Sequence, residues 1–320
     1  MPYTHKDFVP PGYEIESVAG TDVATTRVAF PGELVDFQFM PEFPKEVSSG
    51  PATYTPVGAY GTFFNMGCRV TLKPYFDNVA TSLLALLLGT INAGTGVITV
   101  ADQRTFTVQG GLDLGTDIYR RMRNCRVASF RREYAFGEPT VDTYDIVGIS
   151  RPTADTQSTA WAAAPATLAG SPWVSPGHVT HTFSSGLTFA GAVESGSIEI
   201  NRGSTTVKGL NQTDRVPTST YTGGIMEVKG SVKLLPDDHA AFVAYYTDPQ
   251  TSGGTFTQTI NFTKNAAAQY SNWVITKCLF RDFDPFHWRR NVAEGITWDI
   301  PWEMGADSSA GGTLAVDTVS

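Results

Sequence analysis

The residue types that could hold a metal ion or act as a general base are scattered in this sequence. His178 and His181 are three residues apart in a segment predicted to be strand or loop, so they would point to opposite faces. A zinc site needs three or four ligands, and no third one lies beside them. Asp282, Asp284 and His287 form a second candidate cluster, but the proline and aromatic residues among them favour a packed turn. The sequence therefore predicts no metal and no cofactor.

Arrangements typical of an enzyme or a nucleotide site are also missing. No Ser, His and Asp set has the spacing of a catalytic triad. The glycine-rich stretch 89–96 lacks the Lys and Ser or Thr of a phosphate loop, and 110–117 lacks the acid spacing of a calcium loop. We therefore predict that the protein is not an enzyme.

One charge cluster raises the question of nucleic-acid binding. A similar stretch later in the chain, 271–281, keeps only Lys277 and Arg281, and the net charge of −8 opposes a surface that binds phosphates. We expect the first three arginines of the cluster to form pairs between subunits or rings, with acids such as Asp237 and Asp238. The cluster consists of Arg120, Arg121, Arg123, Arg126, Arg131 and Arg132.

The composition is typical of a turn-rich β-protein. The 320 residues are 41% hydrophobic and 17% charged, the latter against about 25% in an average protein. Cys68, Cys125 and Cys278 are too few for a disulfide framework and indicate buried thiols in a reducing compartment. The N-terminus does not resemble a secretion signal, and no apolar run approaches the roughly 20 residues of a membrane helix. We expect a soluble protein made in the cytoplasm.

An internal repeat is the most informative feature of the sequence. The stretches 35–39 and 198–201 share an alternation of apolar and polar residues, and other short matches follow in the same order. Such matches also arise by chance, but their shared order favours two diverged copies of one domain. The largest difference is an insertion in the first copy around Gly89 to Val97. The further matches are 70–74 with 232–236, 105–107 with 255–257, Cys125 and Phe130 with Cys278 and Phe283, and 143–146 with 297–300.

The repeat predicts a mainly β fold of two tandem β-sandwich or half-barrel domains, each with one flanking α-helix. Helices are expected at 76–88 and 238–246, because each follows a proline and has acidic residues near its first turn. The predicted domains are an N-terminal arm 1–20, a first domain 21–150, a linker 151–177, a second domain 178–304 and a C-terminal tail 305–320. Strands are expected at 35–39, 69–72, 106–108, 127–131, 198–201, 232–235 and 256–262.

Two long connections, 41–62 and 203–224, separate the first two strands of each copy. They are longer than most loops of a compact domain and poor in regular pattern. Both carry apolar and aromatic residues, which predicts that they pack against a partner. These residues are Val47, Tyr54, Val57 and Tyr60 in the first loop and Val207, Val216 and Tyr221 in or beside the second.

This layout resembles the tail tube proteins of long-tailed, non-contractile bacteriophages, whose relatives include contractile tail tubes and type VI secretion tubes. The segments 197–208 and 221–236 are similar to the loop-bearing hairpin of that family. The likeness covers nearly the whole chain except the linker and the tail after Met304. It implies stacked, pseudo-sixfold rings of three chains, a virion location, and a tube for genome delivery.

The resemblance also implies partners. The chain would contact itself between rings, the tape-measure protein and passing DNA in the lumen without specific binding, and tail terminator and distal tail proteins at the ends, with no membrane. The two long loops would carry the contacts between stacked rings.

A strand that lines such a lumen should be apolar toward the core and polar toward the channel. Asp36 and Gln38 alternate with apolar neighbours in the first copy, as do Glu199 and Asn201 in the second. We expect these four residues to face the lumen, where an acidic wall would repel DNA over a Debye length of about 8 Å. An ordinary solvent-facing strand would give the same pattern.

Two other functions remain open. The chain could be another tail assembly protein, such as a terminator, distal tail or decoration protein. It could instead be a carbohydrate-binding β-sandwich or a lytic enzyme, with Trp273, Trp288, Trp298 and Trp302 as a sugar-stacking platform, although no paired carboxylates of catalytic spacing lie beside them.

Overall fold

The structure of the protein is a computed structural model. We call the elements before residue 151 the first half and those after residue 178 the second half, with the linker between. The structure describes residues 8–19, 28–42, 45–49, 56–61, 65–74, 83–91, 97–100, 102–112, 118–150, 156–157, 179–184, 191–207, 217–223, 226–236, 256–265, 269–281, 289–291, 295–305 and 313–319.

The fold is mainly β, as the composition and the alternating patterns predict. The first half and the linker contain β1 (Phe8–Ile15), β2 (Val28–Ala29), β3 (Gly32–Glu42), β4 (Lys45–Ser49), β5 (Pro56–Gly61), β6 (Asn65–Pro74), α1 (Leu83–Leu88), β7 (Gly89–Ile91), β8 (Val97–Val100), β9 (Phe106–Leu112), β10 (Ile118–Ala135), β11 (Val141–Ile149) and β12 (Thr156–Gln157). The second half contains β13 (Val179–Ser184), β14 (Gly191–Asn201), β15 (Ser204–Val207), β16 (Ser219–Thr222), β17 (Glu227–Pro236), β18 (Phe256–Asn265), β19 (Gln269–Phe280), β20 (Arg289–Asn291), β21 (Gly295–Met304) and β22 (Leu314–Val319).

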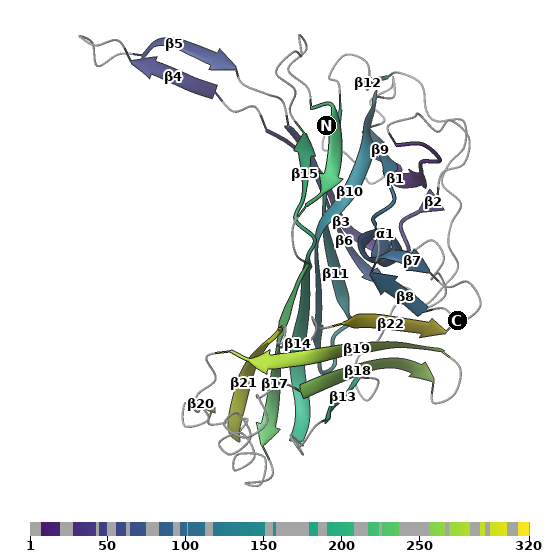
Figure 1. Ribbon diagram of the computed structural model, residues 1–320, viewed down its shortest axis with the longest axis vertical. Coiled ribbons are helices and arrows are strands. Elements are labelled where there is room, and N and C mark those ends of the chain that lie inside the picture. The colour runs from purple at the N-terminus through teal and green to yellow at the C-terminus, as the bar shows by residue number, and fades with distance from the viewer. Residues whose placement is uncertain are drawn as a thin grey trace.

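A long antiparallel sheet runs through both halves (Figure 1). Its strands pair in the order β3-β6-β11-β10 in the first half, and β10 then pairs with β14, which begins the series β14-β17-β21-β19 of the second half. Burial alternates strictly along β11, as expected for a strand with one face on a core. The pairing of β10 with β14 makes the two halves parts of one sheet.

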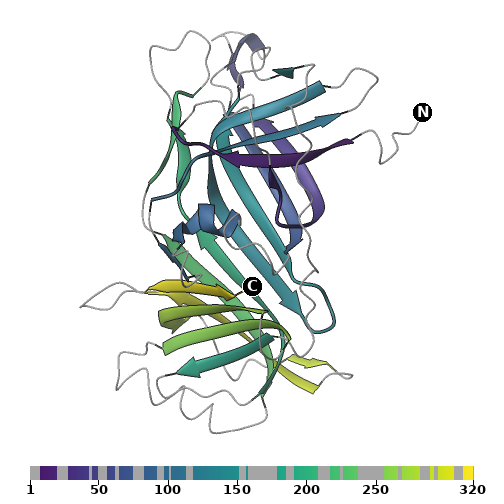
Figure 2. The same cartoon turned by 90° about the vertical axis from the view of Figure 1, so that its right-hand side faces the viewer.

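A second layer of strands covers the core face of this sheet in each half (Figure 2). In the first half, β9 pairs with β10 and carries β1, which in turn pairs with β2. In the second half, β18 pairs with β19 and carries β13, and these strands run crosswise to β14 and β17 in Figure 1. The core between the layers includes Val70, Phe106, Phe130, Ile200 and Trp273, all of which are buried.

Part of the first predicted helix is described, and it is helical. α1 consists of six apolar residues, and every one of them is buried. A helix that is apolar on all sides belongs inside a core. Residues 76–82 of the expected helix and the whole expected helix at 238–246 lie outside the described residues.

The two halves share a bulge in their first strand pair. The register of β3 on β6 shifts between Leu34 and Asp36, opposite Leu72 and Thr71. The register of β14 on β17 shifts at the corresponding place, between Val193 and Ser195, opposite Leu234 and Lys233. This equivalence places Phe39, not Val35, at the position of Ile198. The sequence match of 35–39 with 198–201 is therefore shifted by four residues, although it assigns the side chains to the correct faces of the strand.

The last strand pair of the central sheet requires a smaller shift. Tyr144 lies opposite Val70 in the first half, and Ile300 lies opposite Val232 in the second. The match of 143–146 with 297–300 is therefore displaced by two residues. In both cases the alternating pattern identified the face of the strand but not the register, because a shift by an even number of residues leaves every side chain on its own face.

A second shared irregularity supports the matches around the cysteines. Phe106 pairs with Cys125 and Phe256 pairs with Cys278, and the register of each long strand shifts next to that pair. Each thiol donates a hydrogen bond to the carbonyl three residues earlier, over 3.2 Å for Cys125 and 3.4 Å for Cys278. Phe283, the match to Phe130, lies outside the described residues.

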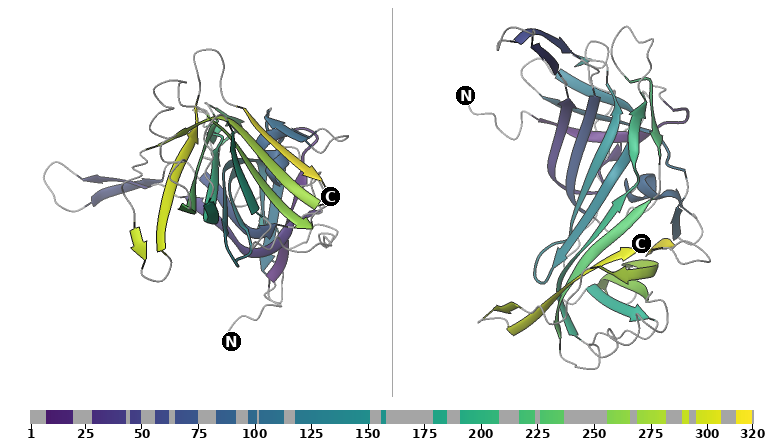
Figure 3. Two further views of the ribbon diagram at one scale, coloured as in Figure 1. Left: turned by 90° about the horizontal axis from the view of Figure 1, so that it is seen from below. Right: turned by 60° about the vertical axis from the view of Figure 1, so that its left-hand side comes forward.

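The two long connections are β-hairpins, contrary to the irregular loops expected from their sequence. β4 pairs with β5 and β15 pairs with β16, each in antiparallel register. Their short strands lack a clear alternation of apolar and polar residues, so the sequence pattern that predicts a strand was absent. Figures 1 and 3 show β4–β5 extending away from the central sheet, whereas β15 lies along β10.

Strands also occur where the sequence predicted an arm, a linker and a tail. β1 includes residues of the expected arm 1–20 and pairs with β9 inside the first half. β12, in the expected linker, pairs with β10. β22, in the expected tail, pairs with β19 on one side and with β8 on the other. β8, at the end of the insertion of the first copy, and β22 together form a second connection between the halves.

Candidate functional site

The face of the central sheet that points away from the core is polar across both halves. Strand register aligns rows of outward side chains, and one row runs from Gln38 through Arg69 and Asp145 to Ser129 and Asn201. A neighbouring row contains Thr71, Thr143, Arg131, Glu199 and Lys229. We call this surface the outer polar face.

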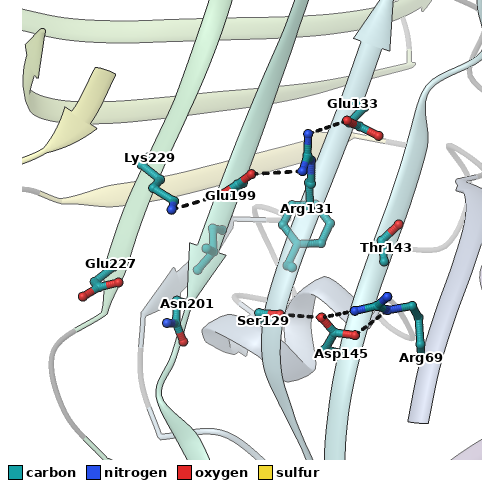
Figure 4. A pocket seen from close by; sticks show the side chains of 12 residues that line it. Arg69, Ser129, Arg131, Glu133, Thr143, Asp145, Glu199, Asn201, Glu227 and Lys229 are labelled. Atoms are coloured by element: carbon teal, nitrogen blue, oxygen red, sulfur yellow. Dashed lines mark hydrogen bonds and ion pairs between the residues drawn. The ribbon is translucent and has the colours of Figure 1, made fainter. Parts of the chain in front are cut away.

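Acids and bases alternate on the outer polar face, and ion pairs connect them (Figure 4). Arg131 of the first half lies 2.6 Å from Glu133 and 3.4 Å from Glu199 of the second half. Glu199 in turn lies 3.3 Å from Lys229. These side chains are solvent-accessible, so each pair contributes about 1 kcal/mol or less to folding. Their main effect is to balance charge across the face.

A second group of ion pairs lies nearer β3, at the edge of the first half. Arg69 contacts Asp145 through both carboxylate oxygens, at 2.7 and 3.2 Å, and Ser129 donates to the same carboxylate at 3.0 Å. This hydrogen bonding raises the pKa of the Arg69 guanidinium above its ordinary value. Lys73 pairs with Glu33 at 2.8 Å.

The four residues predicted to face a lumen all lie on the outer polar face. Asp36 and Gln38 occupy it in β3, and Glu199 and Asn201 occupy it in β14. The wall differs from the acidic one expected, since bases adjoin Glu199 and Arg69 lies opposite Gln38. The sequence pattern of β3 and β14 did not show these bases because they come from other strands.

A buried ion pair lies on the opposite, core face of the sheet, where the halves join. Arg132 and Asp142 form two hydrogen bonds of 2.7 Å each, and their side chains are 3% and 1% exposed. The Arg132 guanidinium also lies 5.0 Å from the ring centre of Phe262 and 5.1 Å from that of Trp273, both in the second half. Cation–π contacts of this kind strengthen when they are desolvated.

Beside this ion pair, a polar contact links Tyr134 of the first half to His181 of the second. The Tyr134 hydroxyl lies 2.6 Å from Nε2 of His181, and Nδ1 of the same ring lies 3.1 Å from the Gln258 amide nitrogen. Burial lowers the pKa of His181 to about 3, so the imidazole stays neutral at physiological pH. His181 is therefore a structural residue of the joint, and His178 lies outside the described residues.

The hairpin β15–β16 is attached to the first half by hydrogen bonds. Oε1 of Gln103 accepts bonds from Ser204 at 2.6 Å and Thr222 at 2.7 Å. Thr220 donates to the backbone carbonyl of Asn124 at 2.7 Å and lies 3.1 Å from its side-chain oxygen. Gln103 and Asn124 were not among the predicted site residues, because isolated amide residues carry no recognisable motif.

The arginine cluster does not form a basic stripe. Successive residues of β10 point to opposite faces, so Arg131 lies on the outer polar face while Arg132 is buried against Asp142. Arg121 is buried, and Arg126 donates to the carbonyl of Gln103 at 2.6 Å. Arg120 and Arg123 are half-buried in the same strand. Asp237 and Asp238, their expected partners between subunits, lie outside the described residues.

The apolar residues predicted in the two long connections lie on the two hairpins wherever the structure describes them. Val207 and Tyr221 are 36% and 48% exposed on the hairpin β15–β16. Val47 lies in β4, and Val57 and Tyr60 lie in β5. Tyr54 and Val216 lie outside the described residues.

The remaining candidate sites are the tryptophan platform and the possible metal cluster. Trp273, Trp298 and Trp302 are buried, so they form no platform for a sugar. Within the ranges described, no three His, Cys, Asp or Glu side chains gather around a common point. The cluster Asp282, Asp284 and His287 lies outside those ranges.

Comparison with known proteins gives no family for this chain, because no family model and no curated protein matches its sequence. Among the described residues, none of the helices has the length and apolar character to cross a membrane.

Proposed function

We propose that this protein is a structural subunit that assembles head to tail into rings, and that stacked rings form a tube with the outer polar face as its channel wall. The observation that carries this proposal is the pairing of β10 with β14. β10 ends the strand order of the first half, and its pairing with β14 continues the sheet into the second half. The strand order of the first half, β3-β6-β11-β10, recurs as β14-β17-β21-β19. We infer that the same kind of strand pairing that joins the two halves also joins one chain to the next.

The edge strand β3 supports the proposal. In the part of the chain that the structure describes, β3 pairs with β6 alone, whereas its counterpart β14 pairs with both β17 and β10. An unpaired edge is a site for adding another strand. A head-to-tail contact that repeats around an axis closes into a ring, and two similar halves per chain give a pseudo-sixfold ring from three chains.

The outer polar face supports a channel for a polyanion. Its acids and bases neutralise one another and alternate with hydroxyls, so the wall offers DNA no basic surface on which to bind. This agrees with the resemblance to phage tail tube proteins. We therefore propose a virion location, a role in genome ejection without catalysis, and a tape-measure protein, a tail terminator and a distal tail protein as partners.

The proposal predicts particles of uniform width. Negative-stain microscopy of the purified protein should show rings or filaments, and mass measurement should give multiples of three chains of 34.5 kDa. A protein that stays monomeric at every concentration and in every assembled form would contradict the proposal.

A single substitution tests the edge strand itself. Val35 is the bulged residue of β3 and is 54% exposed, so a proline there should disturb the β6 pairing little while it hinders the addition of another strand at this edge. Val35→Pro should abolish rings while the protein remains folded by circular dichroism. Val35→Thr, which keeps the N–H, is the matched control and should assemble normally.

A further inference from the structure

The attachment of β15–β16 shows how one half holds a hairpin of the other. Thr220 and Ser204 point from the hairpin into the first half and are buried, whereas Tyr221 is exposed on the other side. The central contact joins Thr220 to Asn124, at 2.7 Å to the carbonyl and 3.1 Å to the side-chain oxygen. We call the surface formed by Gln103, Asn124 and Arg126 the first seat.

The hairpin β4–β5 has the same internal register but projects from the body of the chain. Lys45 pairs with Gly61 as Ser204 pairs with Thr222, and Val47 pairs with Ala59 as Thr206 pairs with Thr220. Ala59 is thus the register equivalent of Thr220, and Tyr60 is that of Tyr221. Figures 1 and 3 show this hairpin extending away from the central sheet.

In the second half, Lys277 is the equivalent of Asn124, the central residue of the first seat. Asn124 and Lys277 are the non-glycine residues with positive φ in the described part of the chain, at 50° and 56°, and each directly precedes a buried cysteine. Positive φ is uncommon for a lysine and persists where the surrounding fold requires it. The carbonyl of Lys277 accepts a hydrogen bond from Gly305 at 2.9 Å, which holds this conformation.

We propose that β4–β5 of one copy docks on the surface around Lys277 of a second copy, as β15–β16 docks on the first seat within the chain. This inference rests on the proposed head-to-tail assembly and identifies the residues at its contact. The hydroxyls of Ser204, Thr220 and Thr222 are replaced at the equivalent positions by Lys45, Ala59 and Gly61. The contact between chains therefore lacks the hydroxyl donors of the contact within the chain. Because it has fewer hydrogen bonds, the contact between chains is the one that opens when rings dissociate.

Engineered disulfides test this placement. Ala59→Cys combined with Lys277→Cys should join chains, because a disulfide forms only when two Cα atoms come within about 7 Å. Thr220→Cys with Asn124→Cys is the matched control within one chain, where the side chains already touch. Because each site adjoins a native thiol, Cys278 or Cys125 is changed to Ser in the respective variant.

Assembled protein would be oxidised and separated on denaturing, non-reducing gels. We expect the Ala59–Lys277 pair to give covalent dimers and trimers, with at least about tenfold more crosslinked chain than Tyr60→Cys with Lys277→Cys, because opposite faces of a strand cannot both reach one partner. Rings that form normally without the Ala59–Lys277 crosslink would overturn the docking site but leave the proposed assembly intact. Absence of rings in the wild-type protein would instead overturn the assembly itself.

Discussion

Asn124 and Lys277 occupy the same position in the two halves, each with positive φ and each one residue before a buried cysteine. Positive φ costs a residue with a Cβ about 1–2 kcal/mol, and asparagine tolerates it better than lysine does. The strain is thus larger at Lys277. Because both positions lie beside a register shift of a long strand, the bulge accounts for this conformation.

Replacing Lys277 with glycine should therefore stabilise the protein. We expect Lys277→Gly to raise the free energy of unfolding by about 1 kcal/mol, since glycine adopts positive φ without a steric penalty. Asn124→Gly should gain less, because it also removes the side-chain contact with Thr220. Urea denaturation measures both. A loss of stability in Lys277→Gly would show that contacts of the lysine side chain outweigh the backbone strain.

The buried ion pair at the joint should be sensitive to loss of either partner. Asp142→Asn leaves the Arg132 charge buried without its carboxylate, which typically costs about 3–5 kcal/mol. Asp145→Asn breaks the exposed pair with Arg69 and should cost about 1 kcal/mol or less. Denaturation midpoints of the two variants compare them directly. Equal losses would contradict the dominant role assigned to burial.

The three thiols should be unreactive in the folded protein. Burial raises the pKa of Cys278 to about 12 and raises that of Cys68 as well, so almost no reactive thiolate exists at pH 8. A colorimetric thiol reagent should label none of the cysteines in native protein and all of them in guanidinium chloride. Val18→Cys, at an exposed position, is the positive control and should react at once.

Charge reversal on the outer polar face should affect its two halves differently. Asp36→Lys is expected to change stability by about 0.5 kcal/mol or less, as is usual at exposed sites. Glu199→Lys should cost more, because it brings a third base beside Arg131 and Lys229. Both proteins should fold, but the double variant should impair genome passage in an infection assay. Normal infection by folded double variant would argue against a channel role for this face.

Disrupting the two hairpins should have different effects. Loss of β4–β5 should impair assembly, whereas loss of the contacts that hold β15–β16 should impair stability. Replacing residues 46–60 with a short Gly and Ser connector should leave stability within about 0.6 kcal/mol, because loop closure depends weakly on length. Ring formation, and with it filament growth, should fail in that variant. Gln103→Ala should instead destabilise the chain by about 1–3 kcal/mol, since it leaves the buried hydroxyl of Ser204 and the half-buried hydroxyl of Thr222 without this acceptor. Thermal melts and light scattering separate the two effects.

The sequence by itself determined the β class and the face on which the polar residues of β3 and β14 lie. Alternation in β3 and β14 correctly grouped Asp36, Gln38, Glu199 and Asn201, because side chains of a strand alternate between faces regardless of partner. The match of Cys125 with Cys278 also had the correct register, since bulky core residues flank both.

Register, partner choice and charge balance were decided only by the tertiary structure. Pairing of β10 with β14 brings Glu199 to Arg131 and encloses Arg132 between Asp142 and the aromatic rings of the other half. The contacts with Glu199 and with the aromatic rings join residues far apart in the chain, and alternation is unchanged when a strand slides by two residues. Periodicity therefore identifies a face, while packing against a particular neighbour selects the register and the charges that meet.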